Sequence, residues 1–408
     1  MITVQDALRL IRETLVPLGI EEVPLDQLQG RLLAQDISAP FSLPRFTNAA
    51  MDGFAVKWDD IRSATDEVPV RLHVTQRIPA GTVATLPVVS GSCAEIMTGA
   101  PIPDGADTVV AFEETSGFRT EYVDIFKAPK HGGNVRYGGE EVATDELLVR
   151  KGSFLSPAEI AVLASFGYVT VLVQKTPRVS IVTVGDEVCM PGEELSGAQI
   201  FNCNRFLLEA SCRSLGIEPV ALRHAPDEKV LLRQTLALAL AECDLLLTAG
   251  GISSGEYDFV QEELSALGVT KKFWNVAQKP GKPLYFGTTI EGKAVFSLPG
   301  NPVSALVCFV KYCVPALAAF EGKIRIESVQ ATLSEPFLVE KKRHRLLPGK
   351  VMLDNGKLLC SISPKVESHK ITSVLGANCL IEAEPSSVPL PAGSEVLCTM
   401  LPWAKMIL

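Results

Sequence analysis

The spacing of apolar positions divides the chain into segments with different predicted structures. Residues 3–16 have apolar side chains three or four positions apart, namely Val4, Ala7, Leu8, Ile11 and Leu15. This spacing is typical of an amphipathic helix. Residues 156–167, SPAEIAVLASFG, predict a second helix, with Ser156 as cap, Glu159 completing a capping box and Gly167 as terminator. We expect both helices to belong to one domain that the intervening chain interrupts.

The pattern of apolar and polar residues changes between about residue 45 and residue 139. Short β-like runs such as VPVRLHV and DTVVAF alternate there with Pro/Gly turns such as IPAG and KHGGN. This pattern predicts a small, mainly β domain.

Residues 177–322 alternate apolar strand-like runs with segments of helix length. The strand-like runs are RVSIVTV, DLLLTA and AVFSLPG, and their uninterrupted apolar character predicts a mostly parallel sheet covered on both faces. Ligands of such sheets bind beyond the carboxyl ends of the strands. Three stretches fall there: VGDEV, TAGGISSGEYD and SLPGNPVSA.

From residue 323 onward the pattern is all-β, with a hairpin predicted at VMLDNGKLLC around Asn355-Gly356. The predicted fold class is therefore multidomain α/β plus β. We expect a discontinuous helical and β domain, an inserted β domain, an α/β domain and a C-terminal barrel-like β domain. Their expected bounds are 1–45 with 140–176, 46–139, 177–322 and 323–408.

Composition excludes several classes of protein. The net charge of −9 over 408 residues argues against nucleic acid as a partner, because a phosphate backbone needs a basic footprint. The N-terminus has no apolar run of signal-peptide type, and Glu242, Asp244 and Lys311 interrupt the most apolar segments, so no membrane span is expected. The ten cysteines are scattered without a zinc pattern, which predicts reduced thiols in a cytoplasmic protein.

The loop TAGGISSG has the chemistry of a phosphate cradle. Its glycines let backbone N–H groups approach an anion, its serines add hydrogen bonds, and a helix follows. Its candidate contacts are Gly250, Gly251, Ser253, Ser254 and Gly255. A plain strand–helix turn explains the same sequence equally well.

Two acids, Glu256 and Asp258, follow this loop. As first-turn residues of a helix they are expected for capping alone. Beside a bound phosphate, however, a carboxylate would repel it unless a divalent cation bridges the two. Mg²⁺ suits such oxygen ligands best.

Positive charge near the loop comes from Lys279 and Lys282 in QKPGKPLYFG, although a lysine pair beside a turn is commonly solvated surface. In SLPGNPVSA, Gly300 would let a ligand approach, with Pro299 and Asn301 beside it. A well-formed helix start is the alternative reading of that loop.

Taken together, seven stretches resemble one family, the MoeA-type molybdopterin molybdenumtransferases, which are related to the E domain of gephyrin. They are TNAAMDGFAV, EIMTGAPIPDGADTVV, VRYGGEEV, TVGDEV, TAGGISSGEYD, QKPGKPLYFG and SLPGNPVSA, in the order typical of the family. The resemblance implies an elongated homodimer of four-domain subunits. It also implies a reaction in which adenylylated molybdopterin and molybdate yield molybdenum cofactor and AMP.

The resemblance also implies roles for individual residues. Functional carboxylates fall at Asp52, Glu187, Asp227 and Asp258, of which the last three would hold Mg²⁺. Thr98 matches a family threonine, Lys279 an oxyanion-binding lysine, and Ser373 a serine of the C-terminal domain. Asp52 belongs to the inserted β domain, so the resemblance places the active site between subunits.

Three positions depart from the family pattern. Asn275 stands where a lysine or arginine is usual, Glu141 where aspartate is common, and Pro348 where an arginine would fall in KKRHRLLPGK. Loss of two positive charges favours, as an alternative, a non-catalytic molybdopterin-binding or scaffolding protein. A molybdopterin adenylyltransferase is a further alternative, although stand-alone forms of that enzyme lack the AMDG-containing insertion and the C-terminal barrel.

Overall fold

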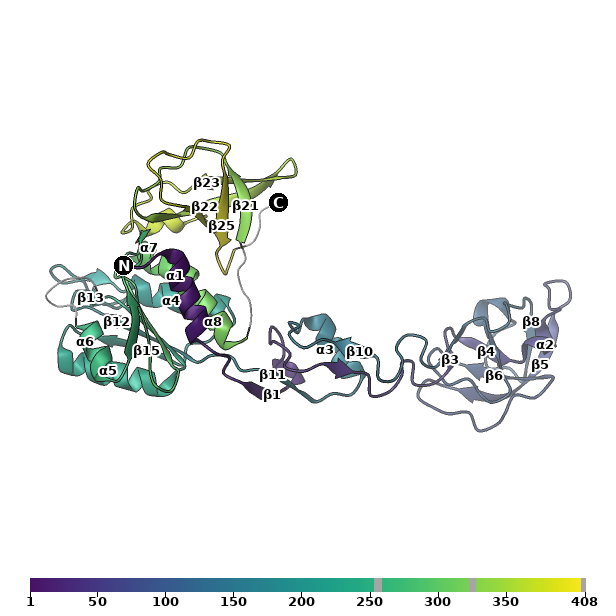
Figure 1. The fold of residues 1–408 in the computed structure, drawn as a ribbon. Helices are drawn as coiled ribbons and strands as arrows, with labels where there is room; N and C mark the ends of the chain where they lie inside the picture. Colours follow the sequence, from purple (N-terminus) through teal and green to yellow (C-terminus); the bar gives the residue numbers. More distant parts are fainter. Residues whose placement is uncertain (253–258, 323–327, 405–408) are drawn as a thin grey trace. The chain divides into compact units, whose positions relative to one another are not determined.

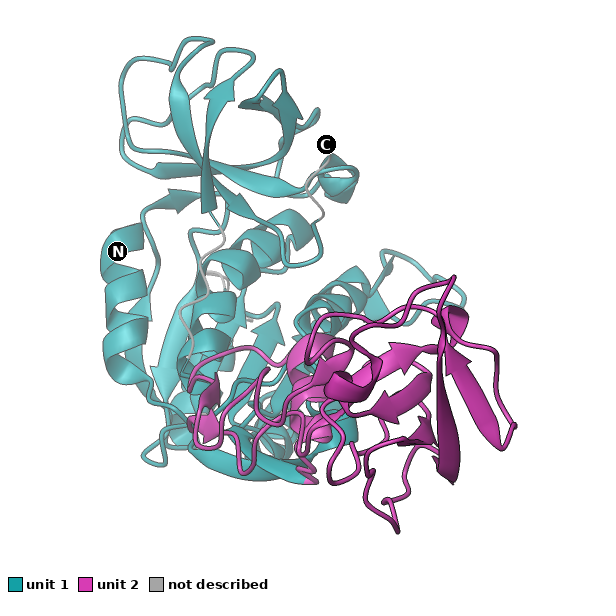
Figure 2. Ribbon diagram, turned by 90° about the vertical axis from the view of Figure 1, so that its right-hand side faces the viewer, with its two compact units in different colours: residues 1–34, 170–408 teal, residues 35–169 magenta. Residues whose placement is uncertain are grey.

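The computed structural model describes residues 1–252, 259–322 and 328–404, and the chain divides into two compact units (Figure 2). Unit 1 comprises residues 1–34 and 170–408, and unit 2 comprises residues 35–169. Strands β1 (Ile20–Pro24) and β11 (Thr170–Gln174) pair antiparallel, so the chain leaves and re-enters unit 1 along adjacent strands. The finer bounds expected at 45, 139, 176 and 322 stay a prediction.

Both helices predicted from the sequence, one from apolar spacing and one from capping signals, are present. Helix α1 (Val4–Thr14) is capped by the side chain of Thr3 and buries its apolar face in unit 1. Helix α3 (Pro157–Ser165), in unit 2, has the complete capping box of Ser156 and Glu159. The cap accounts for where each helix starts, because it satisfies N–H groups that have no partner within the helix.

A six-stranded sheet forms the centre of unit 1 (Figure 1). Its strands, in spatial order, are β15 (Ala221–Ala225), β12 (Val179–Val184), β16 (Leu245–Ala249), β20 (Ala294–Leu298), β19 (Tyr285–Thr288) and β17 (Thr270–Trp274). The first four run parallel and the last two are antiparallel to their neighbours. The expected mostly parallel sheet is confirmed, with an antiparallel edge.

Helices cover both faces of this sheet, as the apolar strands predicted. Alternate residues of β16 enter different cores: Leu245 and Leu247 pack with α1, whereas Leu246 packs on the opposite face. The first face carries α1, α4 (Cys203–Ser214), α7 (Pro302–Cys308) and α8 (Val314–Phe320). The second carries α5 (Lys229–Glu242) and α6 (Val260–Ala266). Strands of this type need apolar residues at every position.

Helices α7 and α8 are joined by a π-helical turn, Phe309–Cys313, so residues 302–320 form one long helix. The turn immediately precedes Pro315, whose ring would clash with a carbonyl in an unbroken α-helix. This helix is long and apolar enough to cross a membrane, but 78% of its apolar window is buried inside unit 1. Such burial is typical of a core helix.

The C-terminal region folds into a closed five-stranded barrel. Its strands are β22 (His344–Asp354), β23 (Lys357–Ile362), β21 (Ser328–Leu333), β25 (Glu395–Met400) and β24 (Cys379–Ala383), and β24 pairs back to β22. The hairpin expected at Asn355-Gly356 is confirmed: Asp354 pairs with Lys357, and both turn residues have positive φ. Strand β18 (Gln278–Lys279) adds to β22 in parallel.

Unit 2 is mainly β, as its turn-rich sequence indicated. Its five-stranded sheet has the order β7 (Thr108–Ala111), β4 (Gly53–Val56), β6 (Ser92–Ile96), β5 (Val70–Ile78) and β8 (Tyr122–Ile125). Two short ribbons, β2 (Ile37–Ser38) with β10 (Leu147–Val149) and β3 (Asn48–Ala49) with β9 (Val135–Arg136), and the short helix α2 (Trp58–Ile61) complete it.

Candidate functional site

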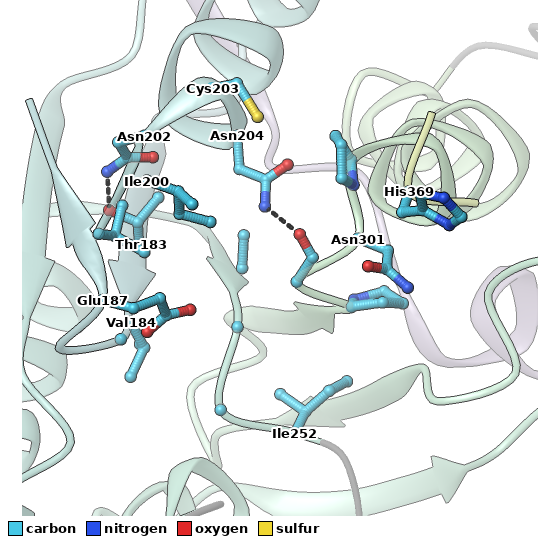
Figure 3. A pocket seen from close by; sticks show the side chains of 18 of the residues that line it. Thr183, Val184, Glu187, Ile200, Asn202, Cys203, Asn204, Ile252, Asn301 and His369 are labelled. Carbon is cyan, nitrogen blue, oxygen red and sulfur yellow. Dashed lines mark hydrogen bonds between the residues drawn. The ribbon is translucent and has the colours of Figure 1, made fainter. Parts of the chain in front are cut away.

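Three neighbouring parallel strands of the central sheet, β12, β16 and β20, end at a cavity of about 660 Å³ (Figure 3). The loop that follows each strand contributes to the lining. Of the residues singled out from the sequence, seven line it: Glu187, Asp227, Gly250, Gly251, Pro299, Gly300 and Asn301. The structure thus brings together the three loops that sequence spacing placed at one sheet edge.

Gly250 is required by the fold itself. Its φ is +97°, and a Cβ there would lie 2.3 Å from the carbonyl oxygen of Val184. Its N–H donates to the carbonyl of Leu298 at 3.2 Å. Gly250 therefore lets the end of β16 pack closely between the ends of β12 and β20. Its N–H is bonded to Leu298 and is not available to a ligand.

Glu187 and Asp227 place two carboxylates at the cavity. Glu187 folds back over Gly185, where a Cβ would lie only 2.4 Å from its Oε2, so glycine makes room for this side chain. Asp227 is fixed by a reciprocal contact: the Asp186 N–H donates to Asp227 Oδ2, and the Asp227 N–H donates to Asp186 Oδ1, each at 3.2 Å. The loop after β12 thus orients both acids.

The charge of the lining favours a divalent cation when an anion binds. Among the described lining residues, two are acids and none is lysine or arginine. A phosphate entering this cavity would be repelled unless a cation lies between. Mg²⁺ typically binds one or two carboxylates together with phosphate oxygens and water, so the donor set fits it. Within the described ranges no cluster of three or more acidic, histidine or cysteine side chains forms a complete metal site.

Two asparagines that the sequence analysis did not single out shape the cavity wall. Asn202 caps α4, accepting from the Arg205 N–H at 3.1 Å, and donates through Nδ2 to Thr183 Oγ1 at 2.7 Å. Asn204 donates through Nδ2 to the Gly300 carbonyl at 2.6 Å (Figure 3). Together they tie the start of α4 to the ends of β12 and β20. Asn202 stands directly before α4, where asparagine is a favoured cap, and Asn204 lies in its first turn.

His369 and Ile371 were also missed, and they reach the cavity from the segment after β23. His369 lies more than 45 positions beyond the α/β segment, so no local pattern connects it to this sheet. The C-terminal region therefore contributes directly to the wall of the cavity.

Lys279 is not among the residues lining the cavity; it lies on β18 beside the barrel. Its Nζ is 2.6 Å from Oε1 of Glu340, and Arg345 Nη1 contacts the same oxygen at 2.9 Å. Lys279 and Arg345 are register partners in the parallel pairing of β18 and β22. Arg343 contacts the other oxygen of Glu340 at 3.3 Å. One carboxylate thus contacts three cations, and the hydrogen bonds and charges of Lys279, the largest influence, and Arg343 lower the pKa of Glu340.

Lys282 and Ser373, the remaining candidates in unit 1, also lie outside the lining. Lys282 is exposed, and its carbonyl accepts from the Val276 N–H at 3.0 Å. Ser373 is 1% exposed and its Oγ has no hydrogen-bond partner among the described residues. It lies two residues after the cavity-lining Ile371.

In unit 2, the structure brings Asp52 and Thr98 together. Asp52 Oδ1 accepts from both the N–H and the Oγ1 of Thr98, each at 2.7 Å. Both residues are exposed. The Thr98 side chain, and next its N–H, lower the pKa of Asp52, so this carboxylate is ionised at neutral pH.

The departures from the family pattern have local structural correlates. Asn275 has φ +65°, its N–H donates to Leu284 O and its own carbonyl accepts from the Ile2 N–H. Asparagine adopts this left-handed conformation more readily than lysine or arginine. Pro348 is buried within β22 opposite Leu380, where an arginine would bury its charge. Glu141 is exposed in unit 2.

Five candidates of the loop after β16 lie outside the residues that the structure describes: Ser253, Ser254, Gly255, Glu256 and Asp258.

Comparison with known proteins gives matches along nearly the whole chain. Three family profiles match: the MoeA N-terminal region (domain I and II) over residues 2–167, a probable molybdopterin binding domain over 180–319, and the MoeA C-terminal region (domain IV) over 330–401. The chain is 33% identical to molybdopterin molybdenumtransferase 2 of Mycobacterium tuberculosis, covering 97% of this chain and 98% of the relative.

Further matches agree with these. A molybdopterin molybdenumtransferase of Haemophilus influenzae is 34% identical to this chain, and the match covers 97% of this chain and 98% of the relative. The crystal structure of a molybdopterin biosynthesis MoeA protein from Pyrococcus horikoshii superposes with a TM-score of 0.81 at 31% identity. That similarity covers 98% of this chain and 99% of the other.

Proposed function

This chain belongs to the MoeA family of molybdopterin molybdenumtransferases, and from that premise we propose that it uses adenylylated molybdopterin and molybdate and releases AMP. It is an enzyme of molybdenum cofactor biosynthesis. The observation that best supports this substrate is the cavity at the ends of β12, β16 and β20, which joins two carboxylates to backbone loops. Its volume suits a small molecule rather than a macromolecule.

The acids of this cavity are proposed to handle the pyrophosphate of the substrate. Glu187 and Asp227, with Asp258 from outside the described residues, would hold Mg²⁺ against the phosphate oxygens. When bound there, Mg²⁺ neutralises negative charge on the phosphates. Asp186 fixes the orientation of Asp227 through their paired contacts, so the carboxylate needs little rearrangement when the substrate enters.

In the proposed reaction a water oxygen attacks one phosphorus of the pyrophosphate and the bridging P–O bond breaks, giving AMP and molybdopterin, with the proton of the water passing to the phosphate products. The two thiols of molybdopterin then bind molybdenum, and one molybdate oxygen leaves with their protons as water. Asp52 stays ionised because Thr98 lowers its pKa, which makes it a poor proton acceptor near pH 7. We therefore assign Asp52 to orienting the water or the cation, with Thr98 holding its carboxylate in one direction. Lys279, with Arg345 beside it, is proposed to receive molybdate, displacing the contact with Glu340.

We further propose that the active form is a homodimer in which Asp52 and Thr98 of one subunit serve the cavity of the other. The two residues belong to unit 2, whereas the carboxylates of the cavity belong to unit 1. Both are exposed and bonded to each other, an arrangement suited to a surface that meets a partner.

The central test measures AMP released from adenylylated molybdopterin with molybdate and Mg²⁺. Glu187→Gln should lower the rate at least about 100-fold, since it removes one charge from the phosphate site. Asp186→Asn keeps the fold and serves as a milder comparison. Wild-type AMP release at the uncatalysed rate would overturn the proposal. Consumption of ATP with free molybdopterin would instead indicate an adenylyltransferase.

Mixing variants tests the shared site. Asp52→Asn and Glu187→Gln proteins, each inactive alone, are mixed under conditions of subunit exchange. If sites are shared between subunits, each mixed dimer contains one intact site. Mixed dimers make up about half of a 1:1 mixture, so the mixture recovers about a quarter of wild-type activity. If each subunit carries a complete site, mixing recovers none.

A further inference from the structure

The strand β14 (Ile200–Phe201) contributes two large apolar residues to the lining of the cavity. Ile200 is 56% exposed and Phe201 is 42% exposed, yet both line the space between the loops after β12 and β20. Figure 3 shows Ile200 and Glu187 directed toward the same open region. Two large, partly exposed apolar residues, the wall formed by Ile200 and Phe201, thus lie beside the carboxylate of Glu187 in the cavity lining.

Hydrogen bonds on both sides hold this wall rigidly. The Ile200 N–H donates to the Glu187 carbonyl at 2.8 Å, and the Asn202 N–H donates to the Cys189 carbonyl at 2.9 Å. These bonds form the parallel ribbon of β14 with β13 (Val188–Cys189). The side chain of Asn202 then anchors the end of the ribbon to Thr183. The backbone that carries this wall is therefore in place before a ligand arrives, which lowers the cost of ordering it at binding.

The shape and chemistry of this wall fit a flat ring. A phenyl face stacks on planar heteroaromatic rings, whose edges remain free for polar groups, and each such contact contributes about 1–3 kcal/mol. Phosphate and molybdate gain nothing from an apolar surface. The wall and the carboxylates therefore suit different parts of one ligand.

We propose that Ile200 and Phe201 form a stacking surface for a planar heterocycle of the substrate, the pterin or the adenine. This inference rests on the proposed function, because adenylylated molybdopterin carries both rings. Since Glu187 precedes this ribbon and bonds Ile200 through its carbonyl, a ring on the wall places its attached phosphate beside that carboxylate. Phe201 is thereby assigned as a specificity-determining residue.

The test compares binding of three probes: AMP, a fluorescent pterin without phosphate, and pyrophosphate, which has no ring. Phe201→Ala should weaken binding of the stacked ring by about 5- to 150-fold and leave pyrophosphate unchanged. Phe201→Tyr should restore the affinity. The matched control is Phe206→Ala, because Phe206 is 45% exposed on α4 but does not line the cavity.

The outcomes separate the two rings. Weakened binding of AMP alone assigns the adenine to the wall, and weakened binding of the pterin alone assigns the pterin. The proposal is overturned if Phe201→Ala binds both rings as the wild type does, if Phe206→Ala loses as much, or if the wild type binds neither ring. These measurements need no turnover. Normal ring binding without AMP release would therefore contradict the proposed reaction and leave the stacking surface intact.

Discussion

The ammonium group of Lys279 is held 2.6 Å from the carboxylate of Glu340. Because Arg345 and Arg343 contact the same carboxylate, Glu340 prevents repulsion among three neighbouring cations. The sequence indicated the charge on Lys279 but not its counter-ion, which lies 61 positions further along the chain. An oxyanion that binds here has to compete with this carboxylate.

Glu340→Gln is therefore expected to tighten binding of molybdate, by up to about 5-fold, since exposed ion pairs contribute about 0.2–1 kcal/mol. Equilibrium dialysis with molybdate or tungstate measures the change. Lys279→Gln should weaken binding in the same assay. Glu291→Gln, an equal charge change at another exposed pair, controls for net charge. Weaker binding by Glu340→Gln than by the wild type would show that Glu340 helps to form the site.

Thr98→Ala should shift the acid limb of the pH profile of AMP release to higher pH. Thr98 lowers the pKa of Asp52 mainly through its hydroxyl, so removing the hydroxyl raises that pKa and protonates the carboxylate earlier as the pH falls. The Thr98 N–H remains and limits the shift. Thr98→Ser should keep the wild-type limb. An unchanged limb in Thr98→Ala would mean that Asp52 does not control it.

Lys311→Met should destabilise unit 1 by about 3–5 kcal/mol, because it leaves a buried carboxylate without its partner. Lys311 Nζ contacts both oxygens of Glu382, at 2.6 and 2.7 Å, and the two side chains are 11% and 4% exposed. Thermal unfolding measures the loss. Lys229→Met, at the exposed pair with Glu262, should cost less than about 1 kcal/mol. Equal losses would contradict the role of burial.

The same pair predicts a dependence of stability on pH. Burial, the largest single influence, raises the pKa of Glu382, but the hydrogen bond from His344 and the charge of Lys311 outweigh it, and the pKa ends below its usual value. This contribution is therefore present above about pH 4.3 and is lost as the pH falls through the folded-state pKa. Glu382→Gln should show a smaller loss of thermal stability between pH 5 and pH 3 than the wild type.

Gly250→Ala and Gly300→Ala should separate a structural glycine from one that faces ligand. At Gly250 the positive φ and the close Val184 carbonyl predict a loss of at least about 1–3 kcal/mol in thermal unfolding. At Gly300 the nearest atom to a new Cβ is 3.8 Å away, so stability should not change. If substrate approaches Gly300, that variant alone should fold normally and bind adenylylated molybdopterin more weakly.

Local patterns predicted much of this fold. The capping box at Ser156, the turn at Asn355-Gly356 and the uninterrupted apolar strands each depend on neighbouring residues, and each was confirmed. The meeting of three strand ends at one cavity followed from parallel topology, because carboxyl ends of parallel strands share an edge.

Contacts between distant segments could not be predicted in the same way. No local rule links Asn204 to Gly300, or the segment of His369 to the ends of the central strands. The π-helical turn before Pro315 was likewise not foreseen, since an apolar run gives the same signal for either kind of helix. Asp52 and Thr98 were predicted as site residues only from resemblance to a family. Their hydrogen bond joins residues 46 positions apart.

Helix α1 leaves the ribosome well before α8, the last helix of the α/β core, yet the two helices pack in one core. About 300 residues separate them, so at typical synthesis rates the apolar face of α1 waits roughly 15–60 s for its partner. The core of the five-stranded sheet in unit 2, which lies between them in sequence, comes from one continuous stretch of chain. During translation the sheet of unit 2 can therefore fold while α1 still lacks its partner α8.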